Sequence, residues 1–194
     1  MVCDVYPLKT DKSFVNTLED VIRKQGVMTK LISDQAQVEI SKRVKDILWA
    51  FIIDDWQSEP HQQQQNFAEC KYQDIKCYVN WVMNSTGAND TEWLLVLQYV
   101  CYIVNHTALK SLDWRTPLEV LTGITPDVSI IYQMFYRMLV YFLKHKGGYP
   151  SDSTEQSGLF VGFSENVGHQ LTFKILMDDT NKIIYWSRVH PQDT

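Results

Sequence analysis

The sequence lacks an apolar run long enough to cross a membrane, since such a span needs roughly 18 or more apolar residues in succession. The two best candidates are Trp93–Val104 and Ser129–Leu143, which are shorter and are interrupted by Gln98, Gln133 and Arg137. The first residues also lack the basic segment and apolar run of a secretory signal. These absences predict an intracellular protein of the cytoplasm or nucleus that is not secreted and has no membrane partner.

The sequence also lacks an excess of basic residues. Its 194 residues include 18 Lys and Arg against 23 Asp and Glu, which gives a formal net charge of −5 at pH 7. This mild acidity argues against a non-specific nucleic-acid binder, because such proteins usually carry a basic excess. It does not argue against a site built from carboxylates. With 45% hydrophobic residues the chain can bury a core, so intrinsic disorder is not expected.

Cysteine is scarce, and its spacing lacks the pattern of a zinc site. The four cysteines, Cys3, Cys70, Cys77 and Cys101, contain no C-x-x-C pair and no His/Cys zinc spacing. Since no secretory signal is expected, we predict reduced thiols in the core rather than disulfides.

The first part of the chain alternates strand and helix signals. A short apolar run at Val2–Tyr6 predicts a strand, and apolar residues at helical spacing over 11–25 predict a helix. Val27–Ser33 predicts a buried strand and 40–48 a second helix, which is followed by a short apolar run at Phe51–Ile53. This alternation is typical of an α/β sheet with parallel strands.

Two long helices and a short one are predicted next. The long helices cover 66–83 and Thr91–His106, and Asp90 is the predicted cap of the second. Thr116–Glu119 has the pattern of a capping box with proline at the first helical position, and Gly123 ends that brief helix.

Beyond Pro126 the sequence becomes rich in β-forming residues. Asp178–Asn181 has the composition of a hairpin connection. The chain therefore divides into a predicted α/β domain at 1–126 and a small all-β module at 127–194. The β-rich runs are Gly158–Phe163, Leu171–Leu176 and Ile183–Val189.

Asp34 and Glu69 form the most informative pair of candidate site residues. Asp34 follows a predicted buried strand, and functional residues in α/β sheets collect beyond the carboxyl ends of strands. Glu69 lies in the first turns of a long predicted helix. Two such carboxylates can hold Mg²⁺, and two ions can clamp the attacking and leaving oxygens of a phosphoryl transfer. Residue type alone leaves open the alternative that both are solvated surface groups.

Two stretches of sequence surround these acidic residues. The first is Leu31–Gln35 followed by Glu39, and the second is Pro60–Glu69, which contains four consecutive glutamines. Glu69 lies 35 positions after Asp34. The two stretches resemble the S-D-N-G-x-E-F and P-x-T-P-Q-Q-N-G-x-x-E-R motifs of the integrase core of copia-type long-terminal-repeat retrotransposons.

Two further stretches follow in the order of the same family. Thr116–Pro126 looks like its T-P-[YL]-E-x-[WL]-T-G-x-x-P segment. Gly158–Phe163 and Ile183–Val189 resemble the SH3-like module that follows the core in such Pol polyproteins. The resemblance therefore runs in order over nearly the whole chain.

The resemblance implies a ribonuclease H-like fold in which two Asp and one Glu bind Mg²⁺ or Mn²⁺. Enzymes of this family transfer DNA ends into target DNA. By motif, Asp34 is the second Asp and Glu69 is the Glu. The first Asp has no counterpart, because the resemblance places the strand that carries Asp4 at a different position of the sheet. We therefore expect an N-terminally truncated core that lacks its first strands, followed by a β-barrel-like module.

The chain also departs from the family pattern beside the site. Gln35 replaces an Asn, Phe67 replaces a small Gly, and Cys70 replaces an Arg that would contact phosphate. The family's N-terminal zinc-binding module is missing as well. We expect an integrase-derived DNA-binding domain that is catalytically incomplete, and the resemblance also suggests a homo-oligomer. The alternative is a non-catalytic nucleic-acid-binding or assembly module. A third hypothesis is a pseudogene product with no selected function.

The resemblance also suggests contacts with nucleic acid. The alternative for each of these residues is an ordinary loop or solvated helix position. The candidates are His61, Asn66, Lys71 and Lys76.

The sequence contains six tryptophans, which we expect to pack in the core or at sheet edges rather than to stack on bases. They include Trp56, Trp81, Trp93 and Trp114.

Overall fold

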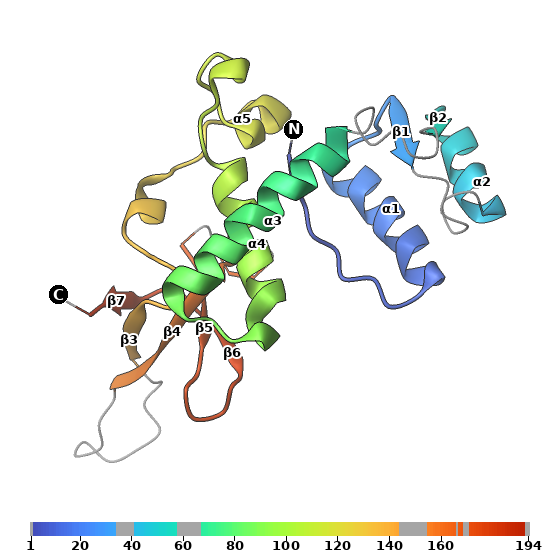
Figure 1. Cartoon of the computed structure of the whole chain (residues 1–194). Coiled ribbons are helices and arrows are strands. Elements are labelled where there is room, and N and C mark those ends of the chain that lie inside the picture. The colour runs from blue at the N-terminus through green and yellow to red at the C-terminus, as the bar shows by residue number, and fades with distance from the viewer. Residues whose placement is uncertain are drawn as a thin grey trace. The chain divides into compact units, whose positions relative to one another are not determined.

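The computed structural model shows a mixed α/β chain that forms two compact units (Figure 1). The N-terminal unit is Val5–Asp74, and the C-terminal unit combines Met1–Asp4 with Ile75–Thr194. The expectation of helices and strands with a β-rich C-terminal region is confirmed. The structure describes residues 2–33, 41–57, 67–143, 155–165, 167–168 and 171–192.

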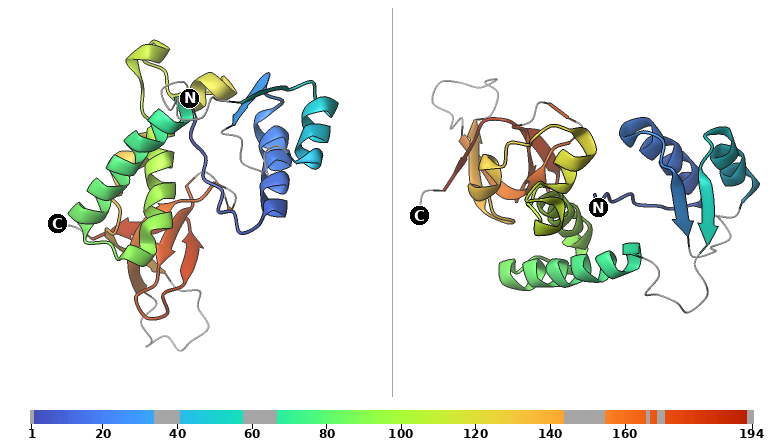
Figure 2. Two further views of the ribbon diagram at one scale, coloured as in Figure 1. Left: turned by 45° about the vertical axis from the view of Figure 1, so that its right-hand side comes forward. Right: turned by 90° about the horizontal axis from the view of Figure 1, so that it is seen from above.

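The N-terminal unit contains a strand–helix–strand crossover preceded by a helix. Helix α1 (Asp11–Gln25) leads into β1 (Lys30–Ser33), and α2 (Lys42–Ala50) connects β1 to β2 (Asp54–Gln57). The two strands are parallel, and both helices lie on one side of them (Figure 2). The first turns of α3 (Phe67–Thr86) complete this unit.

Helix α1 begins and ends where the sequence predicts. The hydroxyl oxygen of Thr10 accepts a hydrogen bond from the main-chain N–H of Ser13 at 3.3 Å, which satisfies one free donor of the first turn. Gly26 ends the helix at a φ of 91°, a conformation that glycine adopts without strain. The apolar face of α1 packs against α2 and the residue before β2. The buried members are Val15, Leu18, Ile22, Val44, Leu48 and Ile53.

The predicted strand at Val27–Ser33 is shorter in the structure. Val27 is exposed, and β1 begins only at Lys30. The apolar run at Phe51–Ile53 follows the end of α2: the N–H of Phe51 donates to the carbonyl of Ile47 at 3.1 Å. Ile53 fills the core, and β2 therefore begins one residue later, at Asp54.

The predicted N-terminal strand at Val2–Tyr6 is wrong. No strand forms there, although the segment is apolar. Cys3 instead forms main-chain hydrogen bonds with the side chain of Asn105. A short apolar segment can thus be satisfied by a single amide side chain without a neighbouring strand.

Two helices open the C-terminal unit. The predicted long helix over 66–83 is confirmed by α3, and Gly87, directly after the helix, has a φ of 63°. A short 3₁₀ turn, η2 (Asp90–Glu92), leads into α4 (Trp93–Asn105). Asn89, rather than the predicted Asp90, is the residue at the N-cap of η2. No helix among the described residues is long and apolar enough to cross a membrane.

The predicted short helix is confirmed. After a 3₁₀ turn, η3 (Lys110–Leu112), helix α5 (Pro117–Thr122) begins with Thr116 accepting a hydrogen bond from the N–H of Glu119 at 3.0 Å. Gly123 ends it at a φ of 74°. The carboxylate of Glu119 accepts a hydrogen bond from the Thr125 hydroxyl at 2.9 Å.

The rest of the unit is a five-stranded antiparallel sheet preceded by the 3₁₀ turn η4 (Ser129–Tyr132). The strand order is β6-β5-β4-β3-β7. The predicted hairpin at 178–181 joins β5 and β6 and is confirmed, but the predicted strand at Ile183–Val189 is divided into β6 and β7. The strands are β3 (Leu139–Leu143), β4 (Glu155–Phe163), β5 (Phe173–Leu176), β6 (Ile183–Trp186) and β7 (Val189–Pro191).

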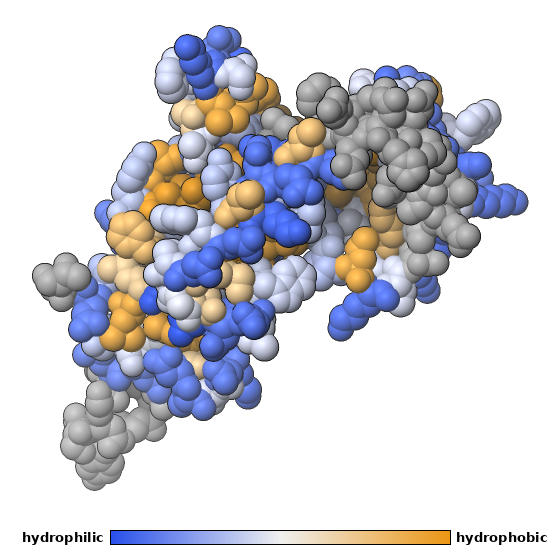
Figure 3. All heavy atoms as spheres, viewed as in Figure 1, coloured by the Kyte–Doolittle hydropathy of each residue, from blue (hydrophilic) through white to orange (hydrophobic). Residues whose placement is uncertain are grey.

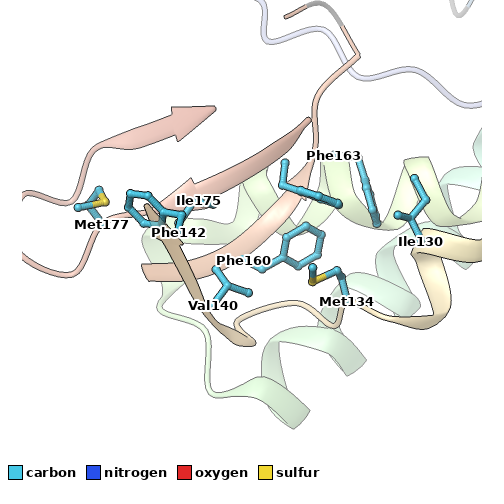
Figure 4. Packing of buried hydrophobic residues seen from close by; sticks show 9 residues of the cluster. Ile130, Met134, Val140, Phe142, Phe160, Phe163, Ile175 and Met177 are labelled. Carbon is cyan, nitrogen blue, oxygen red and sulfur yellow. The ribbon is translucent and has the colours of Figure 1, made fainter. Parts of the chain in front are cut away.

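Helix α4 packs against this sheet. Its side chains Tyr99, Tyr102 and Ile103 contact the buried cluster on the sheet, in which Phe160 lies at the centre (Figure 4). The β-rich region therefore shares its core with a helix from before residue 126. A domain boundary at 126 stays a prediction. The buried cluster contains Ile130, Met134, Val140, Phe142, Phe160, Phe163, Phe173, Ile175 and Met177.

Candidate functional site

The strand before Asp34 ends as the site hypothesis requires. Ser33 is buried, is the last residue of β1, and pairs in parallel register with Gln57 of β2. Asp34 follows directly but lies outside the described residues, as do His61 and Asn66. The structure therefore places the strand end and leaves the position of the Asp34 carboxylate a prediction.

Glu69 lies in the first turn of α3 and is half-buried. A carboxylate there is favoured by the positive end of the helix dipole. No hydrogen bond or ion pair joins Glu69 to another residue in the part of the chain that the structure describes. Its oxygens are thus available, within this part, for a hard cation that prefers oxygen ligands.

The two candidate lysines on α3 lie on different faces. At 3.6 residues per turn, Lys71 is rotated about 200° from Glu69, whereas Gln73 and Lys76 lie on the same face as Glu69. Lys71 forms an ion pair with Asp74 at 3.8 Å, and Lys76 is exposed. The helix therefore brings Lys76, and not Lys71, onto the face of the candidate carboxylate.

Over α3 the visible surface is mainly hydrophilic, with smaller hydrophobic spots (Figure 3). Cys70 and Cys77 on this helix are exposed, contrary to the prediction of core thiols, and only Cys101 is a buried core cysteine as predicted. All four cysteines are free. Within the described ranges, no group of three or more His, Cys, Asp or Glu is arranged to hold a metal ion.

The prediction that the tryptophans pack in the core or at sheet edges is wrong for four of the six. Trp81 and Trp114 are each 71% exposed, and Trp49 and Trp93 are also more than half exposed. Trp56 lies on β2, an edge strand of the two-stranded sheet, as predicted. Trp56 lies beneath the ammonium group of Lys30, 5.7 Å from the ring centroid. Residue type alone gave no signal for this exposure.

A buried carboxylate outside the candidate site was not predicted. Glu92 is buried and accepts hydrogen bonds from Arg137 Nη1 at 2.9 Å and from the Tyr136 hydroxyl at 3.3 Å. Arg137 also donates to the carbonyl of Gly87 at 3.2 Å. Burial, together with the Glu92 charge, raises the pKa of Tyr136. This cluster joins the turn between α3 and α4 to the start of the sheet and has a structural role.

The far end of α4 carries a stack of three rings. His106 stacks on Tyr102 with centroids 3.9 Å apart, and Tyr102 stacks on Phe163 at 4.4 Å. Nδ1 of His106 forms a 2.7 Å hydrogen bond with the carbonyl of Tyr102. Burial lowers the pKa of His106 and raises the pKa of Tyr102 to about 12. Both rings are therefore uncharged near neutral pH.

A lysine lies beside this stack. Lys174 of β5 donates to Oε1 of Gln98 at 3.5 Å, and burial lowers its pKa. The nearby negative charge of Glu165 opposes the effect of burial, because it raises the pKa of both Lys174 and His106. The sequence predicts the helical spacing of the α4 residues. It does not predict that they pack against β4 and β5, which are distant in the chain.

No family model matches the sequence, and no curated protein matches it. Among solved structures, the chain is similar to one chain in the cryo-EM structure of the simian T-cell lymphotropic virus intasome in complex with PP2A regulatory subunit B56 gamma. The similarity has a TM-score of 0.46 and 12% sequence identity, and covers 96% of this chain and 68% of that chain. Similarity at this level does not establish a shared fold, so the function has to be argued from the residues.

Proposed function

We propose that the chain is an integrase-derived domain of a copia-type retrotransposon Pol polyprotein that binds DNA, the ends of the element and their target. The observation that carries the proposal is the order of four motif-like stretches, with Asp34 and Glu69 separated by 35 positions. Two structural features support it. β1 ends directly before Asp34, and Glu69 lies in the first turn of the long helix α3.

A divalent metal is compatible with the residues present. The half-buried Glu69 carboxylate has no partner among the described residues, and Asp34 would add a second oxygen donor. In this proposal Asp34 and Glu69 hold Mg²⁺ or Mn²⁺. The ion would supply charge stabilisation for phosphoryl oxygens. Lys76, on the face of α3 that carries Glu69, would contact a DNA phosphate.

The proposed domain is catalytically incomplete by itself, because no residue takes the place of the first Asp of the family. Asp4 is the candidate nearest the N-terminus, but the segment that carries it forms no strand. DNA binding without efficient strand transfer is therefore the expected behaviour, in the cytoplasm or nucleus where such a domain would act. The ribonuclease H-like fold and any homo-oligomer are part of this proposal.

The test measures DNA binding and strand transfer by the full chain with Mg²⁺ or Mn²⁺. The variant is Glu69→Gln, and the matched control is Asp74→Asn, which removes one exposed carboxylate from the same helix. We expect binding of duplex DNA in all three proteins. Any strand transfer above background should be lost in Glu69→Gln and retained in Asp74→Asn.

Two results would contradict the proposal. Absence of DNA binding at low salt would exclude an integrase-derived DNA-binding role. Equal strand transfer by the wild type and by Glu69→Gln would exclude Glu69 as a metal ligand.

A further inference from the structure

The loop that carries Trp114 is held closed by its own main chain. Leu109 and Arg115 form an isolated antiparallel bridge, in which the N–H of Leu109 donates to the carbonyl of Arg115 at 3.1 Å. The N–H of Trp114 donates back to the carbonyl of Leu109 at 3.0 Å. We refer to Leu109–Arg115 as the Trp114 loop. Its conformation is fixed by hydrogen bonds and not by packing of the indole.

Two consecutive residues of this loop have left-handed backbone conformations. Asp113 has a φ of 55° and Trp114 a φ of 61°. Aspartate tolerates this region, but a bulky residue there is an outlier that carries backbone strain. Because Trp114 is 71% exposed, burial of its indole does not offset the strain. Strained residues held by their surroundings in this way often serve a binding function.

Two basic residues of the loop, Lys110 and Arg115, lie within four positions of Trp114 in the sequence. Lys110 and Arg115 are both exposed, and neither forms an ion pair with a carboxylate of the described residues. Nε of Arg115 donates to the carbonyl of Leu112 at 3.3 Å, which holds the guanidinium close to the loop. With Asp113, the loop has a net charge of 2 − 1 = +1 in a chain of net charge −5.

The surface around the loop has two parts. Hydrophilic residues gather at the top of Figure 3, over the turn that contains η3, and a hydrophobic patch lies next to them towards α5. The exposed apolar residues of that region are Val120, Leu121 and Ile124. The indole therefore belongs to a turn whose other exposed residues are polar or charged.

We propose that the Trp114 loop binds single-stranded nucleic acid. A base stacks on the indole of Trp114, and Lys110 and Arg115 contact the flanking phosphates. Aromatic stacking tolerates any base because every base has a π-face, and basic residues beside it follow the backbone. The charge of the loop is complementary to such an anion, whereas an apolar protein partner would gain nothing from the two cations.

This inference shares its class of partner with the proposed function but does not depend on the Glu69 site. Trp114 lies in the C-terminal unit and Glu69 in the N-terminal unit. Binding by the Trp114 loop requires no metal. It can therefore be measured in the presence of EDTA, where failure of the metal site has no effect.

The experiment measures binding of a fluorescein-labelled 20-nucleotide oligothymidylate to the full chain by anisotropy, at several salt concentrations with EDTA. Trp114→Leu keeps an apolar side chain but removes the stacking surface, and should weaken binding about ten-fold or more. Trp114→Phe should retain most of the affinity. Lys110→Gln and Arg115→Gln should each reduce the salt dependence by about one counterion, and Asp113→Asn should tighten binding.

Trp81→Leu is the matched control. Trp81 is exposed to the same 71%, and no Lys or Arg lies within four residues of it in the sequence. Its replacement should leave the affinity unchanged. Circular dichroism of each variant checks the fold, and Lys110→Gln tests the proposal even if the Trp114 variants unfold.

Three outcomes would overturn the inference. The first is no binding of the oligonucleotide by the wild type at 50 mM salt. The second is equal affinity of the wild type and Trp114→Leu, which would assign the exposed indole to an apolar protein contact. The third is an equal loss in Trp114→Leu and Trp81→Leu.

Discussion

The side-chain amide of Asn105 pairs with both main-chain groups of Cys3. Oδ1 of Asn105 accepts from the N–H of Cys3 at 2.8 Å, and Nδ2 donates to the carbonyl of Cys3 at 2.8 Å. A side-chain amide has the same donor and acceptor as a peptide group, so it satisfies Cys3 as a neighbouring strand would. Asn105 is buried at the end of α4, so these bonds fix the N-terminal residues to the C-terminal unit.

We predict that Asn105→Ala lowers the free energy of unfolding by about 1–3 kcal/mol, because it leaves both groups of Cys3 without this partner. Hydrogen exchange of the peptide that contains Cys3 should become faster. Asn84→Ala, at an exposed position of α3, is the control and should change stability by less than about 0.5 kcal/mol. Unchanged exchange at Cys3 in the Asn105 variant would contradict this account.

Replacement of Glu92 by Gln should be among the most destabilising single changes in the C-terminal unit. Breaking a buried ion pair leaves an unpaired charge and costs about 3–5 kcal/mol. Here the charge left behind is that of Arg137, which pairs with Glu92 at 2.9 Å. The comparison is Asp20→Asn, which removes the exposed ion pair with Arg23. Denaturant titrations that show equal losses for both variants would rule out the structural role of Glu92.

Gly158 cannot accept a side chain without movement of its neighbours. A Cβ at this position would lie 2.6 Å from Cγ2 of Ile175 and 2.9 Å from the carbonyl oxygen of Leu176. Gly158→Ala should therefore cost about 1–3 kcal/mol through overpacking. Ser157→Ala, at the exposed preceding position, is the control. A thermal melt of Gly158→Ala that matches the wild type would show that the strands separate without cost.

Stability below neutral pH should depend on His106. Burial lowers the pKa of this group from 6.5, so the unfolded chain binds a proton more readily than the folded one. The stability that His106 contributes is therefore present above about pH 6.5 and is lost as the pH falls through its lowered pKa. His106→Phe preserves a ring against Tyr102 but cannot titrate.

The measurement is the free energy of unfolding between pH 7 and pH 5. It should fall less in His106→Phe than in the wild type, while the same replacement at the exposed His190 controls for the loss of a histidine. Identical slopes for the wild type and His106→Phe would show that the protonation of His106 is not linked to folding.

Helix ends could be predicted from the sequence because their signals are local. Thr10 and Thr116 cap helices through hydrogen bonds to residues three positions later, and Gly26, Gly87 and Gly123 end helices in conformations that need no distant partner. The hairpin at 178–181 is local in the same sense. These features depend only on neighbours in the chain, so the sequence predicts them correctly.

Short apolar segments could not be assigned in the same way. Val2–Tyr6 and Phe51–Ile53 have similar composition, yet one is fixed by Asn105 and the other ends α2. Ile52 of the second segment is 90% exposed with a φ of 56°. Which of strand, turn or core such a segment becomes depends on tertiary partners that periodicity does not contain.

The candidate site stays a prediction, and only the elements that carry it can be compared with the structure. A strand ends directly before Asp34 and Glu69 lies in the first turn of a helix, as the sequence predicts, because the signals for both elements are local. The meeting of Glu92 with Arg137, 45 residues later, has no sequence signal, and neither has the exposure of Trp114. Such features arise only when separate elements pack together.

The central claim is that Asp34 and Glu69 hold a divalent metal. The most direct test is the binding of Mn²⁺ to the full chain at neutral pH, measured by titration with electron paramagnetic resonance of the free ion. Asp34→Asn and Glu69→Gln should each weaken Mn²⁺ binding ten-fold or more, a difference of about 1.4 kcal/mol or greater, while Asp74→Asn should leave it unchanged. Equal Mn²⁺ affinity in all four proteins, or an equal loss in Asp74→Asn, would contradict the claim.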